Sequence, residues 1–184
     1  MEDDKVYMVV AMRRNGKAKG ENQGLSKKVL RRVVRPGEEY QDTANEFKEM
    51  LSNEPGYWRM YRSVNRRSLT KAKQALQIKL ITDGDRIAHK IDSEWKSLLM
   101  KKEQRAERLY LLDIDTKDEK TVIAIINKVD SLGVALIEQI ETPNGHHIVI
   151  EPLDKRELSE FEDVSVKTDD LVYLFDFGDD SYKS

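Results

Sequence analysis

The sequence predicts an α+β protein, because stretches with the alternating pattern of strands are interspersed with stretches that have the 3.6-residue period of helices. The pattern is clearest in the second half of the chain. The elements expected there are a strand at 108–114, a helix at 118–132, strands at 134–140 and 147–150, a short helix at 152–161 and a strand at 171–177. This β-α-β-β-α-β order is that of the ferredoxin-like, or RRM-like, fold, whose first and third strands lie at the centre of an antiparallel sheet.

Local signals support this order. The helix at 118–132 carries an apolar stripe, and Gly133 follows as its C-terminal stop. The Asn144-Gly145 pair is the strongest short hairpin signal, so a tight turn should join the strands at 134–140 and 147–150.

The first half predicts a second α/β module. The elements expected there are a strand at 5–12, a loop at 13–24, a strand at 29–34, a helix at 37–51, a strand at 57–64, a helix at 68–81 and another helix from 85 to 102. Ser68 is a candidate N-cap, and Asp83-Gly84-Asp85 should interrupt the long helical stretch. Trp95 has helical spacing and is expected in the core. We expect modules at 1–107 and 108–184, packed together as one compact unit.

Composition excludes several classes of protein. The 184 residues include no cysteine, so disulfides, thiolate metal sites and cysteine nucleophiles are excluded. No apolar run reaches the length of about 18 residues that a membrane span needs, and no signal peptide is recognisable, so we expect a cytoplasmic protein. Residues 1–110 carry 25 Lys and Arg against 16 Asp and Glu, whereas residues 111–184 carry 7 against 18. A basic half beside an acidic half suggests a surface for a polyanion next to a carboxylate-rich site, although solvated helix faces would give the same count.

The predicted topology brings polar residues together at one edge of the second sheet. Asp113 and Asp115 are two apart at the end of the first strand, so their side chains should share a face. His147 begins the antiparallel third strand and should lie beside them, whereas His146 should face the other way. Asp169, with Asp170 as the near alternative, precedes the expected fourth strand and should lie at the same edge.

Converging carboxylates repel each other unless a cation joins them, and hard cations such as Mg²⁺ and Mn²⁺ prefer oxygen ligands. We therefore expect Asp113, Asp115 and Asp169 to bind Mg²⁺ or Mn²⁺. Asp176 should be remote, because it lies at the other end of its strand. The alternative is a solvated strand end whose Asp115 or Thr116 merely caps the following helix.

These residues resemble the motifs of a known family. The run Leu-Tyr-Leu-Leu-Asp113-Ile-Asp115 resembles the first motif of the archaeo-eukaryotic primase (primase-polymerase) superfamily, and Gly145-His146-His147 resembles its second. Asp169 or Asp170 falls where the third motif is expected. The resemblance covers roughly residues 108–177 and points to small phage-borne members. It implies that the aspartates hold divalent metal and that His147 contacts the phosphates of the incoming nucleotide.

The basic half offers further candidates for phosphate binding. Arginine binds phosphate bidentately and aromatic rings stack on bases, so the segment around Tyr57, Trp58 and Tyr61 could face a nucleotide or a nucleic acid. The residues expected to hold phosphate are Arg62, Asn65, Arg66, Arg67 and Lys71. Equally, the aromatic residues could belong to the core and the arginines to the solvated surface.

The expected function is that of a metal-dependent nucleotidyltransferase of the primase-polymerase type, with nucleoside triphosphates and a DNA or RNA strand as partners and no membrane. The resemblance also makes a virus-encoded protein acting in the host cytoplasm an expectation. Two alternatives stay open. One is a non-catalytic RNA- or DNA-binding module on a ferredoxin-like sheet, and the other is a metal-dependent phosphodiesterase or nuclease.

Overall fold

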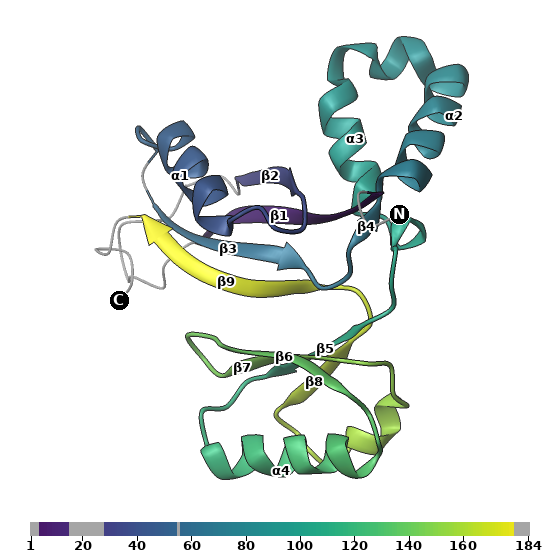
Figure 1. Cartoon of the computed structure of the whole chain (residues 1–184). Coiled ribbons are helices and arrows are strands. Elements are labelled where there is room, and N and C mark those ends of the chain that lie inside the picture. Colours follow the sequence, from purple (N-terminus) through teal and green to yellow (C-terminus); the bar gives the residue numbers. More distant parts are fainter. Residues whose placement is uncertain (1–3, 15–27, 55, 179–184) are drawn as a thin grey trace. The chain divides into compact units, whose positions relative to one another are not determined.

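The computed structural model describes residues 4–14, 28–54 and 56–178, and the chain divides into two compact units (Figure 1). The first unit comprises the described residues up to Arg62, Arg66–Ala106 and the described residues from Leu174 on. The second comprises Ser63–Asn65 and Glu107–Tyr173. The α+β class is confirmed. The chain passes from one unit to the other near residues 63, 66, 107 and 174.

The first unit is built on an antiparallel sheet with the strand order β2-β1-β3-β9, and β4 pairs with the start of β1. Its elements are β1 (Lys5–Arg14), β2 (Val29–Val34), α1 (Tyr40–Met50), β3 (Tyr57–Ser63), β4 (Arg67–Ser68), α2 (Leu69–Ile87), η2 (Ala88–Lys90), α3 (Ile91–Leu99), η3 (Lys102–Gln104) and the end of β9 (Leu171–Gly178).

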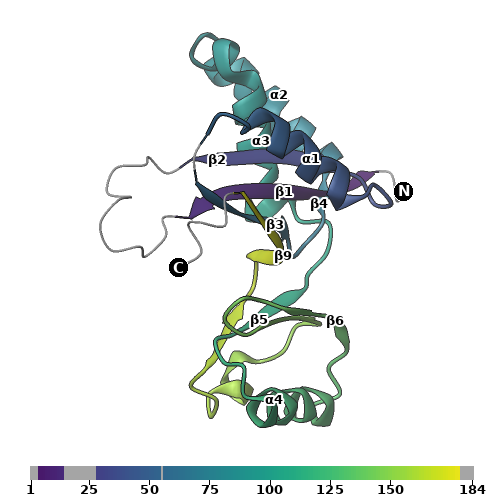
Figure 2. The ribbon, with the colours of Figure 1, turned by 90° about the vertical axis from the view of Figure 1, so that its left-hand side faces the viewer.

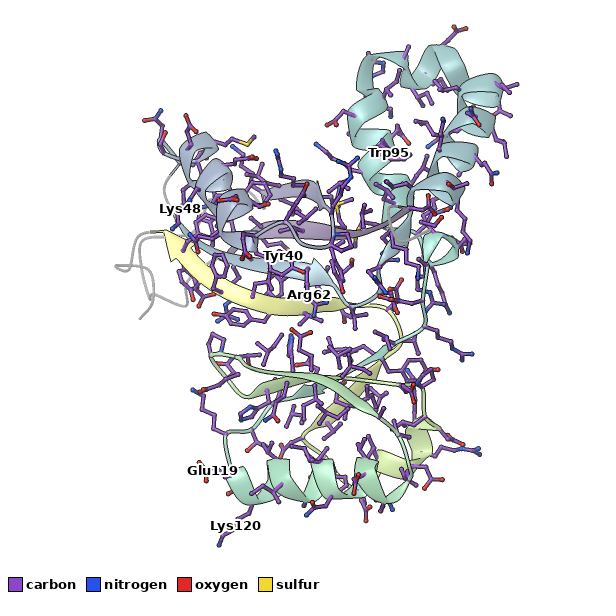
Figure 3. All side chains as sticks on the ribbon, viewed as in Figure 1. Tyr40, Lys48, Arg62, Trp95, Glu119 and Lys120 are labelled. Carbon is purple, nitrogen blue, oxygen red and sulfur yellow. The ribbon has the colours of Figure 1, made fainter. Side chains whose placement is uncertain are left out.

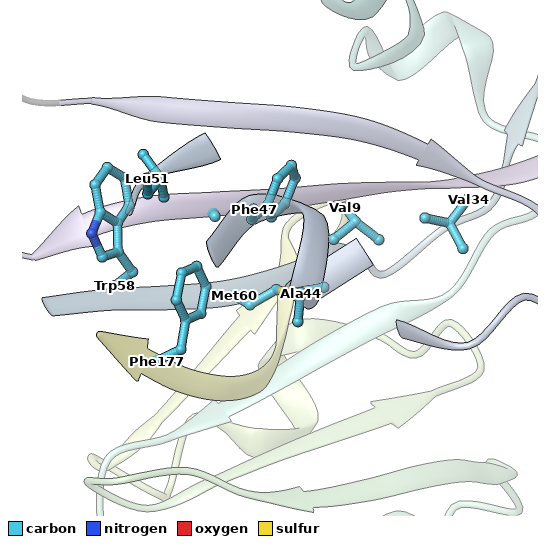
Figure 4. Packing of buried hydrophobic residues seen from close by; sticks show 9 residues of the cluster. Val9, Val34, Ala44, Phe47, Leu51, Trp58, Met60 and Phe177 are labelled. Atoms are coloured by element: carbon cyan, nitrogen blue, oxygen red, sulfur yellow. The ribbon is translucent and has the colours of Figure 1, made fainter. Parts of the chain in front are cut away.

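Helix α1 covers one face of this sheet (Figure 2). Phe47 and Ala44 of α1 pack against Val9 and Met60 of the sheet and are almost completely buried (Figure 4). Trp58 belongs to the same cluster, and its ring stacks on that of Phe177 from β9, with 6.4 Å between the ring centroids. The aromatic residues of β3 are therefore core residues of this unit, which is the blander of the two interpretations that the sequence left open.

Helices α2 and α3 form a hairpin that projects from the sheet (Figure 1). The Ser68 side chain accepts a hydrogen bond from the Lys71 N–H, which confirms it as the N-cap of α2. Asp83 has non-helical backbone angles and kinks the helix at the predicted interruption. The prediction that Trp95 lies in the core is wrong: it is only partly buried, and Ile91 on the same helix is 41% exposed.

The second unit contains the predicted ferredoxin-like sheet, with the strand order β6-β7-β5-β8 and antiparallel pairs throughout. Its elements are β5 (Tyr110–Ile114), α4 (Glu119–Ser131), β6 (Leu136–Glu141), β7 (His146–Ile150), η4 (Lys155–Leu158), β8 (Val164–Lys167) and the start of β9. Asp118 caps α4, whose buried stripe of Val122, Ile125 and Val129 packs on one face of the sheet. The short helix predicted at 152–161, between β7 and β8, is only the 3₁₀ turn η4.

One topological prediction is wrong. The strand that pairs with β5 as the fourth of this sheet is Val164–Lys167, whereas Leu171–Gly178 forms β9 and joins β3 in the other sheet. The reason is that β9 buries apolar side chains in the cores of both units. Val172 at the start of β9 packs with Val64 and Leu111 in the second unit, but Phe177 belongs to the core of the first. In the described part of the chain, no helix is long and apolar enough to cross a membrane.

Candidate functional site

Asp113 and His147 lie opposite each other on the two central strands of the second sheet. They are paired in the β5–β7 register, and the His147 Nε2 lies 3.3 Å from the Asp113 Oδ1. Leu112 and Ile114 pack on the α4 side of the sheet, so alternation places Asp113 on the opposite face, the same face as Leu111. The expected convergence of Asp113 with His147 is therefore present.

The hydrogen bonds of His147 define its tautomer. Its Nδ1 accepts a hydrogen bond of 3.0 Å from the backbone N–H of Tyr173, so the N–H donor of the ring is Nε2. The Nε2–H therefore donates to the Asp113 carboxylate. His147 is thus held between a backbone amide and a carboxylate.

Asp113 is poised to stay ionised. The hydrogen bond from His147 lowers the pKa of the Asp113 carboxyl below its ordinary value, partial burial opposes this shift, and the charges of His147 and Lys167 add to the lowering. Lys167 lies on β8, two residues beyond Ser165, which is the β8 partner of Asp113, so both share the face of Asp113. The sequence analysis missed Lys167, because it placed the fourth strand after this residue.

Asp115 directly follows β5, at the same end of the strand as Asp113. Its backbone N–H donates to the carbonyl of Asp163 at 2.9 Å, which extends the β5–β8 pairing by one residue beyond Ile114 and Val164. Asp115 and Asp163 are both exposed. Residues directly opposite in an antiparallel pair share a face, so Asp163, which directly precedes β8, is the acidic residue nearest in register to Asp115. The alternating Val-Ser-Val-Lys that follows Asp163 was the signal that could have revealed this neighbour.

Asp169 and Asp170 lie at the other end of β5, so their predicted convergence with Asp113 is wrong. Lys167 pairs with Leu111, and the chain then runs on past the start of β5. Asp169 accepts a hydrogen bond from Asn65, whose amide also bonds the backbone of Leu109. Leu109 is four residues before Asp113, a separation of about 13 Å along a strand. The error follows from the wrong choice of the fourth strand.

Asn65 is a structural residue of the second unit. It is fully buried, its Oδ1 accepts from the Leu109 N–H at 2.6 Å, and its Nδ2 donates to the Leu109 carbonyl, the Thr168 carbonyl and the Asp169 carboxylate. The amide thereby joins three chain segments that are distant in the sequence. The prediction that Asn65 binds a nucleotide phosphate is not supported by this geometry, because the amide is committed to internal bonds.

The basic residues predicted to bind phosphate differ in how far they are buried. Arg62 is 5% exposed, and its guanidinium lies over the ring of Tyr7, 4.8 Å from the centroid. Arg67 is 1% exposed and donates to the carbonyl of Lys101. Both arginines are therefore interior residues rather than surface groups for phosphate. Arg66 is partly exposed and Lys71 exposed, although the Lys71 Nζ donates to a backbone carbonyl at 3.1 Å.

Asp176 belongs to the first unit. Its carboxylate accepts a hydrogen bond from the Tyr57 hydroxyl, and Arg59 forms an ion pair with it at 3.4 Å. Asp176 is therefore a structural carboxylate of the first unit, engaged by Tyr57 and Arg59.

Gly145 controls how closely the hairpin approaches β5. A Cβ atom at this position would lie 1.9 Å from the carbonyl oxygen of Ile114 and 2.9 Å from the amide nitrogen of Thr116. The Thr142 side chain holds the turn by accepting from the Gly145 N–H at 3.0 Å. Only glycine therefore fits at the residue two before His147, which gives a steric reason for the small residue in the Gly-His-His sequence.

Within the described residues, no group of three or more acidic or histidine side chains is close enough to hold a metal ion. The available oxygen donors at this edge are Asp113 and Asp115, with Asp163 next in register. Comparisons with protein-family models, with curated proteins and with solved structures give no match. The function therefore has to be inferred from the residues of the site.

Proposed function

We propose that this protein is a metal-dependent nucleotidyltransferase of the primase-polymerase type, which joins nucleotides to a nucleic-acid strand. The observation that carries the proposal is the Asp113–His147 pair on adjacent central strands of a ferredoxin-like sheet, with Asp115 directly after the end of β5. An ionised carboxylate oriented by a hydrogen bond from a histidine is a suitable metal ligand, because its negative charge is fixed in place before the metal arrives.

The donor set fits Mg²⁺ or Mn²⁺. Magnesium is commonly held by one or two carboxylates and completed by substrate phosphates and water, so Asp113 and Asp115 suffice when a nucleotide is bound. Once bound, the metal would neutralise phosphate charge and lower the pKa of the attacking hydroxyl. The third acidic ligand implied by the family resemblance is not supplied by Asp169.

The protein's own groups have separable roles in this proposal. Asp113 and Asp115 hold the cation, and His147 fixes the orientation of the Asp113 carboxylate. Lys167, on the same face as Asp113, is the cation of this unit best placed to meet a nucleotide phosphate. We also propose that the protein acts in the cytoplasm on nucleoside triphosphates and a DNA or RNA strand, and that it is encoded by a virus.

The test is a strand-extension assay. The purified protein is incubated with Mn²⁺, labelled nucleotides and a primed template, and the wild type is compared with Asp113→Asn. Asp130→Asn is the matched control, because Asp130 is an exposed aspartate of the same unit on α4, the helix that covers the opposite face. Extension should be lost in Asp113→Asn and retained in the control.

Other outcomes reassign the protein. Shortened strands that also depend on Asp113 would make it a nuclease or phosphodiesterase. Strand binding with neither extension nor shortening would make it a binding module. Calorimetry adds a test of the metal: equal Mn²⁺ affinity in the wild type and in the Asp113→Ala, Asp115→Ala double variant would reject the proposed ligands.

A further inference from the structure

The first unit contains a groove that the proposed function does not use. It has a volume of about 570 Å³ and is lined by β2, the C-terminal half of α1 and the first turns of α3. The volume is that of a small-ligand site, large enough for a base with its sugar and phosphate but too small for a duplex. Strand β2 is an edge strand of the sheet, so the groove runs beside backbone groups that have no neighbouring strand.

The charges in the groove are mainly positive. Arg31 and Arg32 of β2 and Lys96 of α3 line it, against one acidic residue, Asp92. Lys96 is held by Asp92 at 2.7 Å, and Arg32 is paired with Glu46 of α1. Arg31 is exposed, and among the residues that the structure describes no ion pair or hydrogen bond of its side chain is found. Arg31 is therefore the cation most readily available to an anionic ligand.

The groove also offers apolar surface. Trp95 of α3 is partly exposed at its wall, and Met50 at the end of α1 is 66% exposed (Figure 3 labels Trp95). A partly exposed indole and an exposed arginine that line the same groove combine a stacking surface with a phosphate contact. An acidic peptide would use the positive charge but would leave the indole without a planar partner. The combination therefore favours a nucleotide base and its phosphate.

We propose that this groove binds a short segment of single-stranded nucleic acid, with a base against Trp95 and the backbone phosphate against Arg31. This strand-binding site lies within the first unit, and it goes beyond the proposed function because it requires neither metal nor nucleotide. Binding to it can therefore be measured with the chemistry switched off, and its failure can be distinguished from failure of the Asp113 assay.

The test uses the full chain, a short oligothymidylate and a metal-free buffer. Binding should quench tryptophan fluorescence, and the quenching should largely disappear in Trp95→Phe, because the other tryptophan, Trp58, is 1% exposed. Trp95→Ala should weaken binding by between about 5-fold and 150-fold, the range for loss of one stacked base. Circular dichroism of each variant verifies that it is folded.

Salt dependence tests the phosphate contact. Arg31→Ala should reduce the slope of log affinity against log salt by about 0.7, the value for one phosphate of a single strand. Lys48→Ala is the matched control, because Lys48 is an exposed cation on α1 that does not line the groove (Figure 3). The control should leave both the affinity at a fixed salt concentration and the slope nearly unchanged.

Two results would overturn the inference. The first is equal affinity and equal salt slope in the wild type, Arg31→Ala and Trp95→Ala, which would mean that any strand binds elsewhere. The second is quenching of Trp95 by a polyglutamate peptide but not by the oligonucleotide, which would make the groove a site for an acidic peptide.

Discussion

Replacement of Gly145 by alanine should destabilise the second unit more than any other small substitution in its turns. The added Cβ would lie 1.9 Å from the Ile114 carbonyl oxygen, whereas carbon and oxygen normally approach no closer than about 3.3 Å. The atoms would have to separate by about 1.4 Å. Because both are tied to backbone, this shift would have to widen the strand spacing of about 4.8 Å next to the Asp113–His147 pair.

The expected cost is about 3 kcal/mol, the upper end of the usual range for overpacking, because no flexible side chain can move aside. Gly133→Ala is the matched control. Gly133 has a φ of +66°, so alanine there is strained by about 1 kcal/mol, but no atom lies within 4 Å of its Cβ position. The comparison separates a steric clash from the loss of glycine's backbone freedom.

Amide hydrogen exchange is the appropriate measurement. Both tryptophans lie in the first unit, so their fluorescence does not report on this one. Amides of β5 and β7 should exchange about a hundredfold faster in Gly145→Ala than in the wild type, and about fivefold faster in Gly133→Ala. Equal protection in the two variants would refute the steric argument.

Three further predictions concern single side chains. Asn65→Ala should lower the free energy of unfolding by about 2 kcal/mol or more in denaturant titrations, because buried backbone groups lose their partner; the exposed Asn45→Ala should cost under about 0.5 kcal/mol, and equal costs would contradict the role of Asn65. His147→Phe should raise the pKa of Asp113 toward its ordinary value in a carboxyl NMR titration; an unchanged pKa would show that the histidine bond is not its cause. Ser68→Ala should cost about 1 kcal/mol through loss of the α2 cap, seen as a lower Tm, and an unchanged Tm would argue against the cap.

The sign of the pH effect follows from the direction of the Asp113 shift. A carboxyl whose pKa is lowered in the folded state stabilises the fold above its ordinary pKa of about 3.9, and this contribution is lost as the pH falls through the lower folded value. His147→Phe should therefore be destabilised relative to the wild type at neutral pH, and the Asp113 part of that difference should vanish in acid.

Much of the second unit could be predicted from local sequence. The turn at 142–145 and the stop at Gly133 each act within a few residues, so the hairpin and α4 were predicted close to their observed limits. The cap of α4 is Asp118, whereas the sequence suggested Asp115 or Thr116. Alternation within β5 and the antiparallel return of β7 then placed Asp113 opposite His147. These features depend on hydrogen bonds and periodicities that a short segment carries by itself.

The choice of strand partner was decided only by the tertiary structure. Two segments had the pattern of a fourth strand, and the longer one joined the other sheet because Phe177 packs on Trp58 in the first unit. That choice moved Asp169 to the far end of β5 and brought Lys167 to the face of Asp113. Burial likewise decided that Arg62 is an interior residue. Local pattern specifies that a segment is a strand, but its partner depends on the apolar surface that distant segments offer, and only the folded chain determines which surface is available.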